Sequence, residues 1–162
     1  MELPRTWEGV VLPEWIDRNG HLNVGYYMVA FDEATTGFFD LCGLDDHHRK
    51  QHGVATFSVE SHATYERELL VGDPITVTTQ LLGWSERKVH YFHRMFHAEE
   101  GYLAATNELL SLHVSSSERR TKNLAGEILK RLAELYETSG DLPRPVQQGR
   151  VISVSAGRPG AG

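Results

Sequence analysis

Apolar residues recur at helical spacing in one segment of the first third of the chain. From Val24 to about Cys42, apolar side chains recur three or four positions apart, and polar side chains fill the opposite side. The apolar positions are Tyr27, Met28, Phe31, Ala34, Phe38 and Leu41. We therefore predict a long, half-buried helix with Asn23 as its N-cap and Gly43 at its C-terminal end.

The pattern changes to period two beyond residue 54, which is typical of strands covered on one face. The residues predicted to share the covered face of the strand that begins here are Ala55, Phe57, Val59, Ala63 and Tyr65. Further strands are expected over residues 6–13, 75–81, 87–98 and 102–114. The charged segment 45–52 is interpreted as a loop with solvated histidines.

One opening strand, one long helix and four consecutive antiparallel strands predict an α+β domain whose five-stranded sheet wraps the helix. A second amphipathic helix is expected after the sheet, with Leu124, Ile128, Leu132 and Leu135 on its apolar side. We assign residues 1–142, this C-terminal helix included, to a single domain. Residues 143–162 lack periodicity, and we expect them to form a flexible tail.

Composition narrows the class of protein. With 162 residues and 40% hydrophobic content, the chain can bury one compact core. A formal net charge of -6 argues against nucleic-acid binding. The chain lacks a secretory signal and a long apolar run, so we expect a cytoplasmic protein with no membrane contact. Cys42 is the single cysteine; we expect it to be a buried helix residue, and we predict no metal site.

The loop ahead of the long helix holds the candidate chemistry. Four polar residues lie within seven positions: Asp17, Asn19, His21 and Asn23. The first amides of the helix, at Val24 and Gly25, carry partial positive charge and can hold an oxyanion. Asp17 can attack a carbonyl carbon or deprotonate water. Asp and Asn also favour ordinary turns, but the added histidine, the second asparagine and the following helix favour a catalytic loop.

The spacing Asp17-x-Asn19-x-His21-x-Asn23, followed by Tyr27, resembles the signature of hotdog-fold acyl thioesterases of the 4-hydroxybenzoyl-CoA thioesterase-like superfamily. The resemblance continues through Tyr65 and Gly72-Asp73. It implies a hotdog fold and an acyl-CoA thioesterase that needs no cofactor. Because hotdog domains pair around their active sites, it also implies a homodimer or homotetramer.

The resemblance implies catalytic and binding roles for individual residues. The amide of Val24, or that of its neighbour Gly25, would bind the thioester oxygen. Asn19 and Asn23 would orient water or the carboxylate, and His21 would donate a hydrogen bond or share in base chemistry. The candidate substrate contacts are Tyr27, Thr64, Arg87 and Lys88, the last two through the phosphates of coenzyme A.

Other functions stay open at this point. A hotdog hydratase or dehydratase also uses an aspartate and a histidine on one loop, but here Gly20 replaces the usual proline and His21 comes one position early. A non-catalytic acyl-CoA sensor would keep the pocket without needing Asp17. The segment Pro13-Glu14-Trp15-Ile16-Asp17 is similar to thioesterases of betaine and carnitine catabolism, whose cationic acyl group would suit an aromatic pocket. The chain has no Gly-x-Ser-x-Gly motif, so a serine-hydrolase route is not supported.

Overall fold

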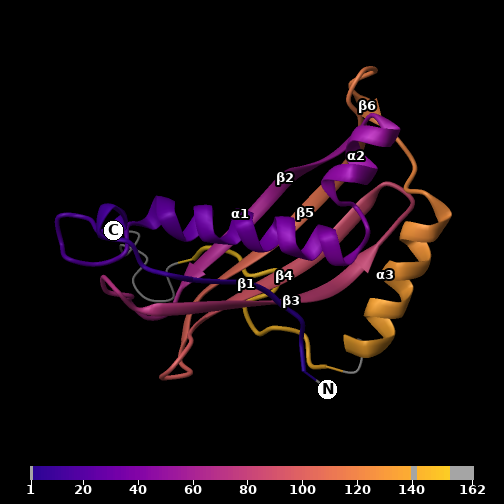
Figure 1. Cartoon of the computed structure of the whole chain (residues 1–162). Coiled ribbons are helices and arrows are strands. Elements are labelled where there is room, and N and C mark those ends of the chain that lie inside the picture. Colours follow the sequence, from indigo (N-terminus) through magenta and orange to yellow (C-terminus); the bar gives the residue numbers. More distant parts are fainter. Residues whose placement is uncertain (1, 140–141, 154–162) are drawn as a thin grey trace, which may run out of the picture.

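A curled antiparallel sheet wraps around one long helix in the computed structural model, which describes residues 2–139 and 142–153 (Figure 1). The strand order is β1-β3-β4-β5-β2, so β1 and β2 form the two edges, and a short β6 pairs with β5. The strands are β1 Arg5–Val10, β2 Val54–Tyr65, β3 Pro74–Trp84, β4 Lys88–His97, β5 Leu103–Ser115 and β6 Arg120–Thr121. The predicted α+β fold, with five main strands around a helix, is confirmed.

The long helix α1, Val24–Leu41, begins and ends as its sequence predicts. The side chain of Asn23 accepts a hydrogen bond from the amide of Gly25, and Gly43 follows the helix with a positive φ of 81°. The apolar face of α1 lies on the concave side of the sheet, where Phe31 stacks on His93 of β4. Gly37 lets β1 approach closely, because a Cβ atom at this position would collide with the carbonyl oxygen of Thr6.

The charged segment after α1 forms a short helix, so its interpretation as a loop was wrong. Helix α2 spans Asp46–His52; Asp45 caps it by accepting from the amide of His48 at 2.8 Å, and Gly53 ends it in the left-handed conformation. His48 is buried rather than solvated. A seven-residue helix with few apolar residues has no periodicity to detect, and its caps are the main signal.

A β-bulge at Val59 divides the alternation of β2 into two halves. Ser58 pairs with Ser111 and Glu60 pairs with Leu110, so Val59 is an extra residue opposite β5. A one-residue insertion turns every later side chain to the other face. Ala63 and Tyr65 therefore face α1, whereas Phe57 faces away from it and is 58% exposed. The prediction that these residues share one covered face was wrong for this reason.

Helix α3, Gly126–Ser139, is the predicted C-terminal helix, and its buried Ile128 and Leu132 pack with the end of α1. Residues 142–153 continue along the convex face of the sheet, where the amide of Gly149 donates to the carboxylate of Glu108 at 2.7 Å. The expected flexible tail thus has contacts over its described part, and residues 154–162 lie outside the described residues. Within the two described ranges, no helix has the length and apolar character needed to cross a membrane.

Candidate active site

The loop between residues 16 and 22 is a tight hairpin that presents Asp17. Ile16 and Leu22 form an antiparallel bridge, and the amide of Asp17 donates to the carbonyl of His21 at 2.9 Å. The amide of Gly20 donates to the carbonyl of Asp17, and Gly20 adopts a φ of 85° that favours glycine. Local hydrogen bonds therefore fix the position of the carboxylate before any substrate arrives.

Asp17 is held as an anion by its own loop. Its Oδ1 accepts from the backbone amide of Asn19 at 2.8 Å and, more weakly, from that of His21 at 3.4 Å. These donors, with Asn19 first, hold the pKa of Asp17 below its usual value. The side-chain amide of Asn19 lies 3.5 Å from Oδ2. An ionised carboxylate is what both a nucleophile and a general base require.

The start of α1, which lines the same cavity as Asp17, offers one free amide. The amide of Gly25 is bonded to Oδ1 of Asn23 at 2.9 Å, and that of Tyr26 is bonded to the carbonyl of Asn23. Among the described residues, no hydrogen-bond acceptor engages the amide of Val24. Of the amides expected to bind an oxyanion, Gly25 is thus occupied by the cap, and Val24 is available. Asn23 acts on this site through the helix start that it caps.

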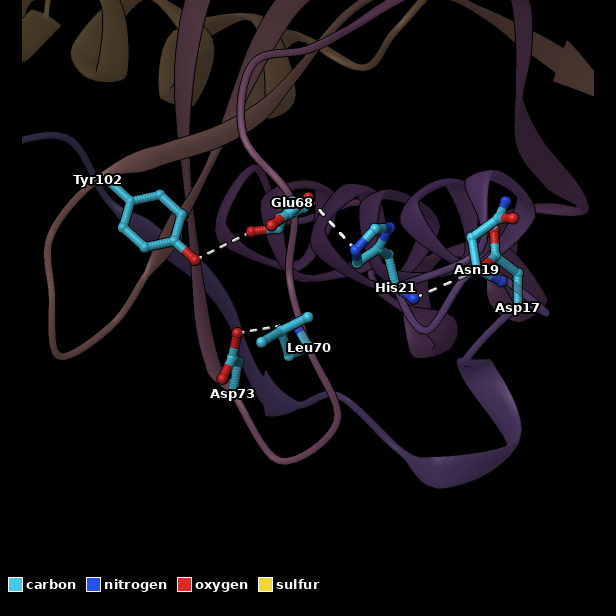
Figure 2. Close-up of polar contacts among 7 residues, drawn as sticks. All are labelled: Asp17, Asn19, His21, Glu68, Leu70, Asp73 and Tyr102. Atoms are coloured by element: carbon cyan, nitrogen blue, oxygen red, sulfur yellow. Dashed lines mark hydrogen bonds and ion pairs between the residues drawn. The ribbon is translucent and has the colours of Figure 1, made fainter.

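His21 has a partner that sequence reasoning missed. Its Nε2 lies 3.4 Å from Oε2 of Glu68, in the segment after β2 (Figure 2). The carbonyl of Glu68 accepts from the hydroxyl of Tyr102 at 3.0 Å, and the amide of Leu22 donates to the carbonyl of Leu69 at 2.8 Å. These bonds fasten the segment after β2 to the Asp17 loop and to the β4–β5 hairpin. The sequence signal was only a charged stretch after a strand.

A cavity of about 330 Å³ collects these groups. Its walls come from the loop, the start of α1 and the end of β2: Asp17, His21, Leu22, Val24, Tyr27, Tyr65, Glu66, Arg67 and Glu68. Tyr27 and Tyr65 meet edge to face, with ring centroids 5.2 Å apart. Burial raises the pKa of Tyr27 to about 12, so its phenol is neutral at physiological pH.

Three candidate substrate contacts lie outside this cavity. Thr64 points to the convex face, where its hydroxyl bonds to Thr106 at 2.6 Å and to Glu66 at 2.8 Å. Lys88 pairs with Leu112 of β5, whereas Tyr65 pairs with Ala105 of the same strand. This offset of seven residues corresponds to roughly 23 Å along the strand.

Arg87 lies at the same distant end of the sheet, where its Nε donates to Asn123 at 2.6 Å. A single subunit therefore does not bring Arg87 or Lys88 to Asp17.

His90 and His93 of β4 lie on opposite faces of the sheet. His93 is fully buried between the hydroxyls of Thr35 and Thr79, at 3.0 and 2.7 Å from its two ring nitrogens, and burial lowers its pKa to about 3. His90 pairs with Glu108 on the convex face at 2.8 Å. In the part of the chain that the structure describes, no three His, Cys, Asp or Glu side chains gather as metal ligands would. Cys42 is buried, as expected.

Known proteins are similar to this chain in sequence and in fold. The profile of the family described as the thioesterase-like superfamily matches residues 11–132. A betainyl-CoA thioesterase of Pseudomonas aeruginosa is 37% identical over 149 residues, which cover 92% of this chain and 94% of that protein. An L-carnitine dehydrogenase/betainyl-CoA thioesterase of Ruegeria pomeroyi is 33% identical over 86% of this chain, a match that covers 28% of that longer protein.

Solved structures agree over nearly the whole chain. A hypothetical protein of Staphylococcus aureus in complex with CoA superposes with a TM-score of 0.87 at 27% identity, covering 95% of this chain and 98% of its own. A putative thioesterase of Pseudomonas putida gives a TM-score of 0.84 at 28% identity, covering 96% and 99%. Since the family profile spans the loop, α1 and strands β2 to β5, the chain belongs to the thioesterase-like superfamily, as a thioester hydrolase with the hotdog fold.

Proposed function

We propose that this protein is an acyl-CoA thioesterase that releases a carboxylic acid and free coenzyme A, with Asp17 as its catalytic carboxylate. The observation that carries this proposal is the anionic Asp17 in one cavity with the free amide of Val24. A carbonyl carbon between them would have an attacking group on one side and an oxyanion donor on the other. Relatives named as betainyl-CoA thioesterases and the neighbouring structure with CoA support the substrate class.

The chemistry needs only these groups and water. The thioester oxygen accepts from the amide of Val24 while the carbonyl carbon is attacked, either by Asp17 itself or by a water that gives its proton to Asp17. The tetrahedral intermediate collapses as the carbon–sulfur bond breaks, and the sulfur leaves with the electron pair and takes up a proton. In the direct route, water then hydrolyses the anhydride between Asp17 and the acyl group. Both routes give the same acid and thiol.

The neighbouring polar residues orient these steps. Asn19 holds Asp17 through its backbone amide and borders the carboxylate with its side chain. Asn23 holds the helix start that carries Val24. His21, aligned by Glu68, is placed to donate a hydrogen bond to the reacting oxygen or to an ordered water.

We further propose that two copies pair through the β2 edge. This edge strand of twelve residues is long, and Phe57 and Val59 are about half exposed along it. Unpaired edges of this kind readily add another strand. Antiparallel pairing of two β2 strands would bring the Lys88 end of one sheet toward the Tyr65 end of the other. Arg87 and Lys88 could then reach coenzyme A bound in the partner subunit's cavity.

Thiol release tests the proposed activity. Purified protein would be assayed with acetyl-, betainyl-, medium-chain, long-chain and aromatic acyl-CoAs, with free thiol detected by a thiol-reactive dye. Betainyl-CoA is the first substrate to try, because the relative at 37% identity bears that name. Turnover of at least one thioester that is lost in Asp17→Asn supports the proposal. Tight binding of acyl-CoA with no thiol release would instead indicate a sensor.

A further inference from the structure

We infer that Tyr65 determines specificity by holding a positively charged acyl group against its ring, with Tyr27 completing the aromatic corner and Glu68 adding negative charge. This inference rests on the proposed thioesterase function and assigns to that site the residues that choose its substrate. A trimethylammonium group is the chemistry that fits this combination of aromatic faces and carboxylates.

The bulge at Val59 turns the side chain of Tyr65 toward the cavity. Phe57, before the bulge, faces away from α1, and an unbroken alternation would turn Tyr65 the same way. The extra residue instead turns Tyr65 to the concave side, where it lines the cavity with Asp17. Tyr65 remains 49% exposed there, so its ring has surface left for a ligand.

The two tyrosines form a corner of fixed geometry. Tyr27 is buried in the core beneath the cavity and is 5% exposed, and its ring meets that of Tyr65 at an interplanar angle of 69°. Burial raises the pKa of both phenols, so both rings are neutral at physiological pH. The negative face of a neutral ring attracts a methylated ammonium, which has no N–H and is easily desolvated.

The charge of the cavity has the matching sign. Asp17 and Glu68 line it with their carboxylates, and Arg67 is the one lining residue with a permanent positive charge. Arg67, however, lies over the ring of Tyr102, 3.8 Å from its centroid, and pairs with Glu100 at 3.7 Å.

The positive charge of Arg67 is therefore engaged by the β4–β5 hairpin, and the carboxylates dominate the cavity. Such a cavity disfavours the phosphates of coenzyme A and favours a cationic acyl end.

Glu68 is the cavity carboxylate with a fixed partner. Its Oε2 lies 3.4 Å from Nε2 of His21. A carboxylate that is positioned before binding loses little entropy when a cation arrives. The carboxylate of Glu66 is instead anchored toward the convex face, where its Oε1 accepts from the hydroxyl of Thr64 at 2.8 Å and from the side-chain amide of Gln147 at 3.3 Å.

A matched pair of substrates tests the effect of charge. Betainyl-CoA and tert-butylacetyl-CoA have the same shape, because the second replaces the quaternary nitrogen by carbon. The ammonium also activates the carbonyl, so each kcat/KM is divided by the rate of uncatalysed hydrolysis of the same thioester. For the wild-type enzyme we expect this normalised value to be roughly 3- to 30-fold higher for betainyl-CoA. Tyr65→Leu should bring this ratio close to one, whereas Tyr65→Phe, which keeps the ring, should preserve it. Glu68→Gln should lower the ratio, whereas an effect through His21 would change the turnover of both thioesters alike.

The outcomes separate this inference from the proposed function. Equal normalised values for the two thioesters with the wild type would overturn the inference and leave the thioesterase intact. A charge preference that persists in Tyr65→Leu would overturn the role of Tyr65. Loss of the preference in Tyr65→Leu, with turnover of tert-butylacetyl-CoA retained, supports it. Absence of thiol release from every acyl-CoA would instead refute the proposed function itself. If Tyr65→Leu does not fold, the ratios for Glu68→Gln and the wild type decide.

Discussion

The carboxylate of Asp17 accepts a 2.8 Å hydrogen bond from the backbone amide of Asn19, two residues further along the same loop. This bond both shapes the turn and lowers the pKa of Asp17, so the loop itself keeps the candidate catalytic group charged. The side chain of Asp17 therefore both stabilises the turn and supplies the candidate catalytic charge. A substitution that tests its function must preserve the turn.

Asp17→Asn should lower kcat/KM for acyl-CoA by about 10²–10⁴-fold. The asparagine side chain can still accept from the amide of Asn19, so the loop should keep its shape while losing the anion. Thiol release measures the activity, and thermal unfolding should give a melting temperature close to that of the wild type. Asp46→Asn, on the exposed start of α2, is the matched control and should retain full activity. Comparable activity in Asp17→Asn and Asp46→Asn would rule out the role of Asp17.

Asn23→Ala should both destabilise the protein and impair catalysis. Loss of the cap costs about 1 kcal/mol, and the loosened helix start displaces the amide of Val24. We expect kcat/KM to fall by at least about ten-fold, short of the 10²–10³-fold cost of removing an oxyanion donor. Asp45→Ala removes the equivalent cap from α2, away from the cavity. It should cost similar stability in urea unfolding and leave kcat/KM unchanged; a parallel loss of activity in both variants would indicate a purely structural effect.

His93 should make the fold sensitive to acid. Its pKa is about 3 when folded, against an ordinary histidine pKa of 6.5, so the unfolded chain binds the proton more readily. Below pH 6.5 the free energy of unfolding should therefore fall by about 1.4 kcal/mol per pH unit, down to a pH near the folded pKa. His93→Gln keeps a hydrogen-bonding side chain between Thr35 and Thr79 but does not titrate. Urea unfolding between pH 7 and pH 5 should show a shallower loss of stability for this variant than for the wild type, and equal slopes would contradict the prediction.

Gly37→Ala should destabilise the protein even though alanine is the better helix former. The gain in helix propensity is about 1 kcal/mol. The added methyl group would meet the backbone carbonyl of Thr6, and forcing β1 away from α1 costs about 1–3 kcal/mol. Gly126→Ala, at the start of α3, meets open space and should be neutral or stabilising. Chemical denaturation of both variants compares the two effects directly.

Charges on the β2 edge should separate the proposed dimer. In gel filtration, the wild type should elute well above its chain mass of 18.2 kDa. Phe57→Lys combined with Val59→Lys should shift it toward that mass, because edge lysines oppose strand pairing. Val71→Lys changes an equally exposed apolar residue away from β2 and should leave the elution volume unchanged. A wild-type protein that elutes as a monomer would refute the dimer.

The sequence predictions were correct where a feature depends on interactions between residues close in sequence. The helix after Asn23, its cap and the end at Gly43 were predicted correctly, because caps and helical periodicity act within a few residues. The polar loop of Asp17 and His21 was placed correctly ahead of the helix for the same reason, and its catalytic role stays a prediction. The short helix α2 was missed because its seven residues show no apolar periodicity. Its two caps were the only local signals.

The chain by itself determined the long helix, the five main strands, the α+β class and the polar loop in front of the helix, since these depend on local backbone preferences and on the alternation of apolar residues. Only the tertiary structure decided that Glu68 meets His21 and that Lys88 lies far from Asp17. It also decided that Tyr65 faces the cavity, because a bulge is defined by pairing with a strand some fifty residues away in sequence. The candidate loop could therefore be found in the sequence, whereas the walls of the cavity depend on strand register.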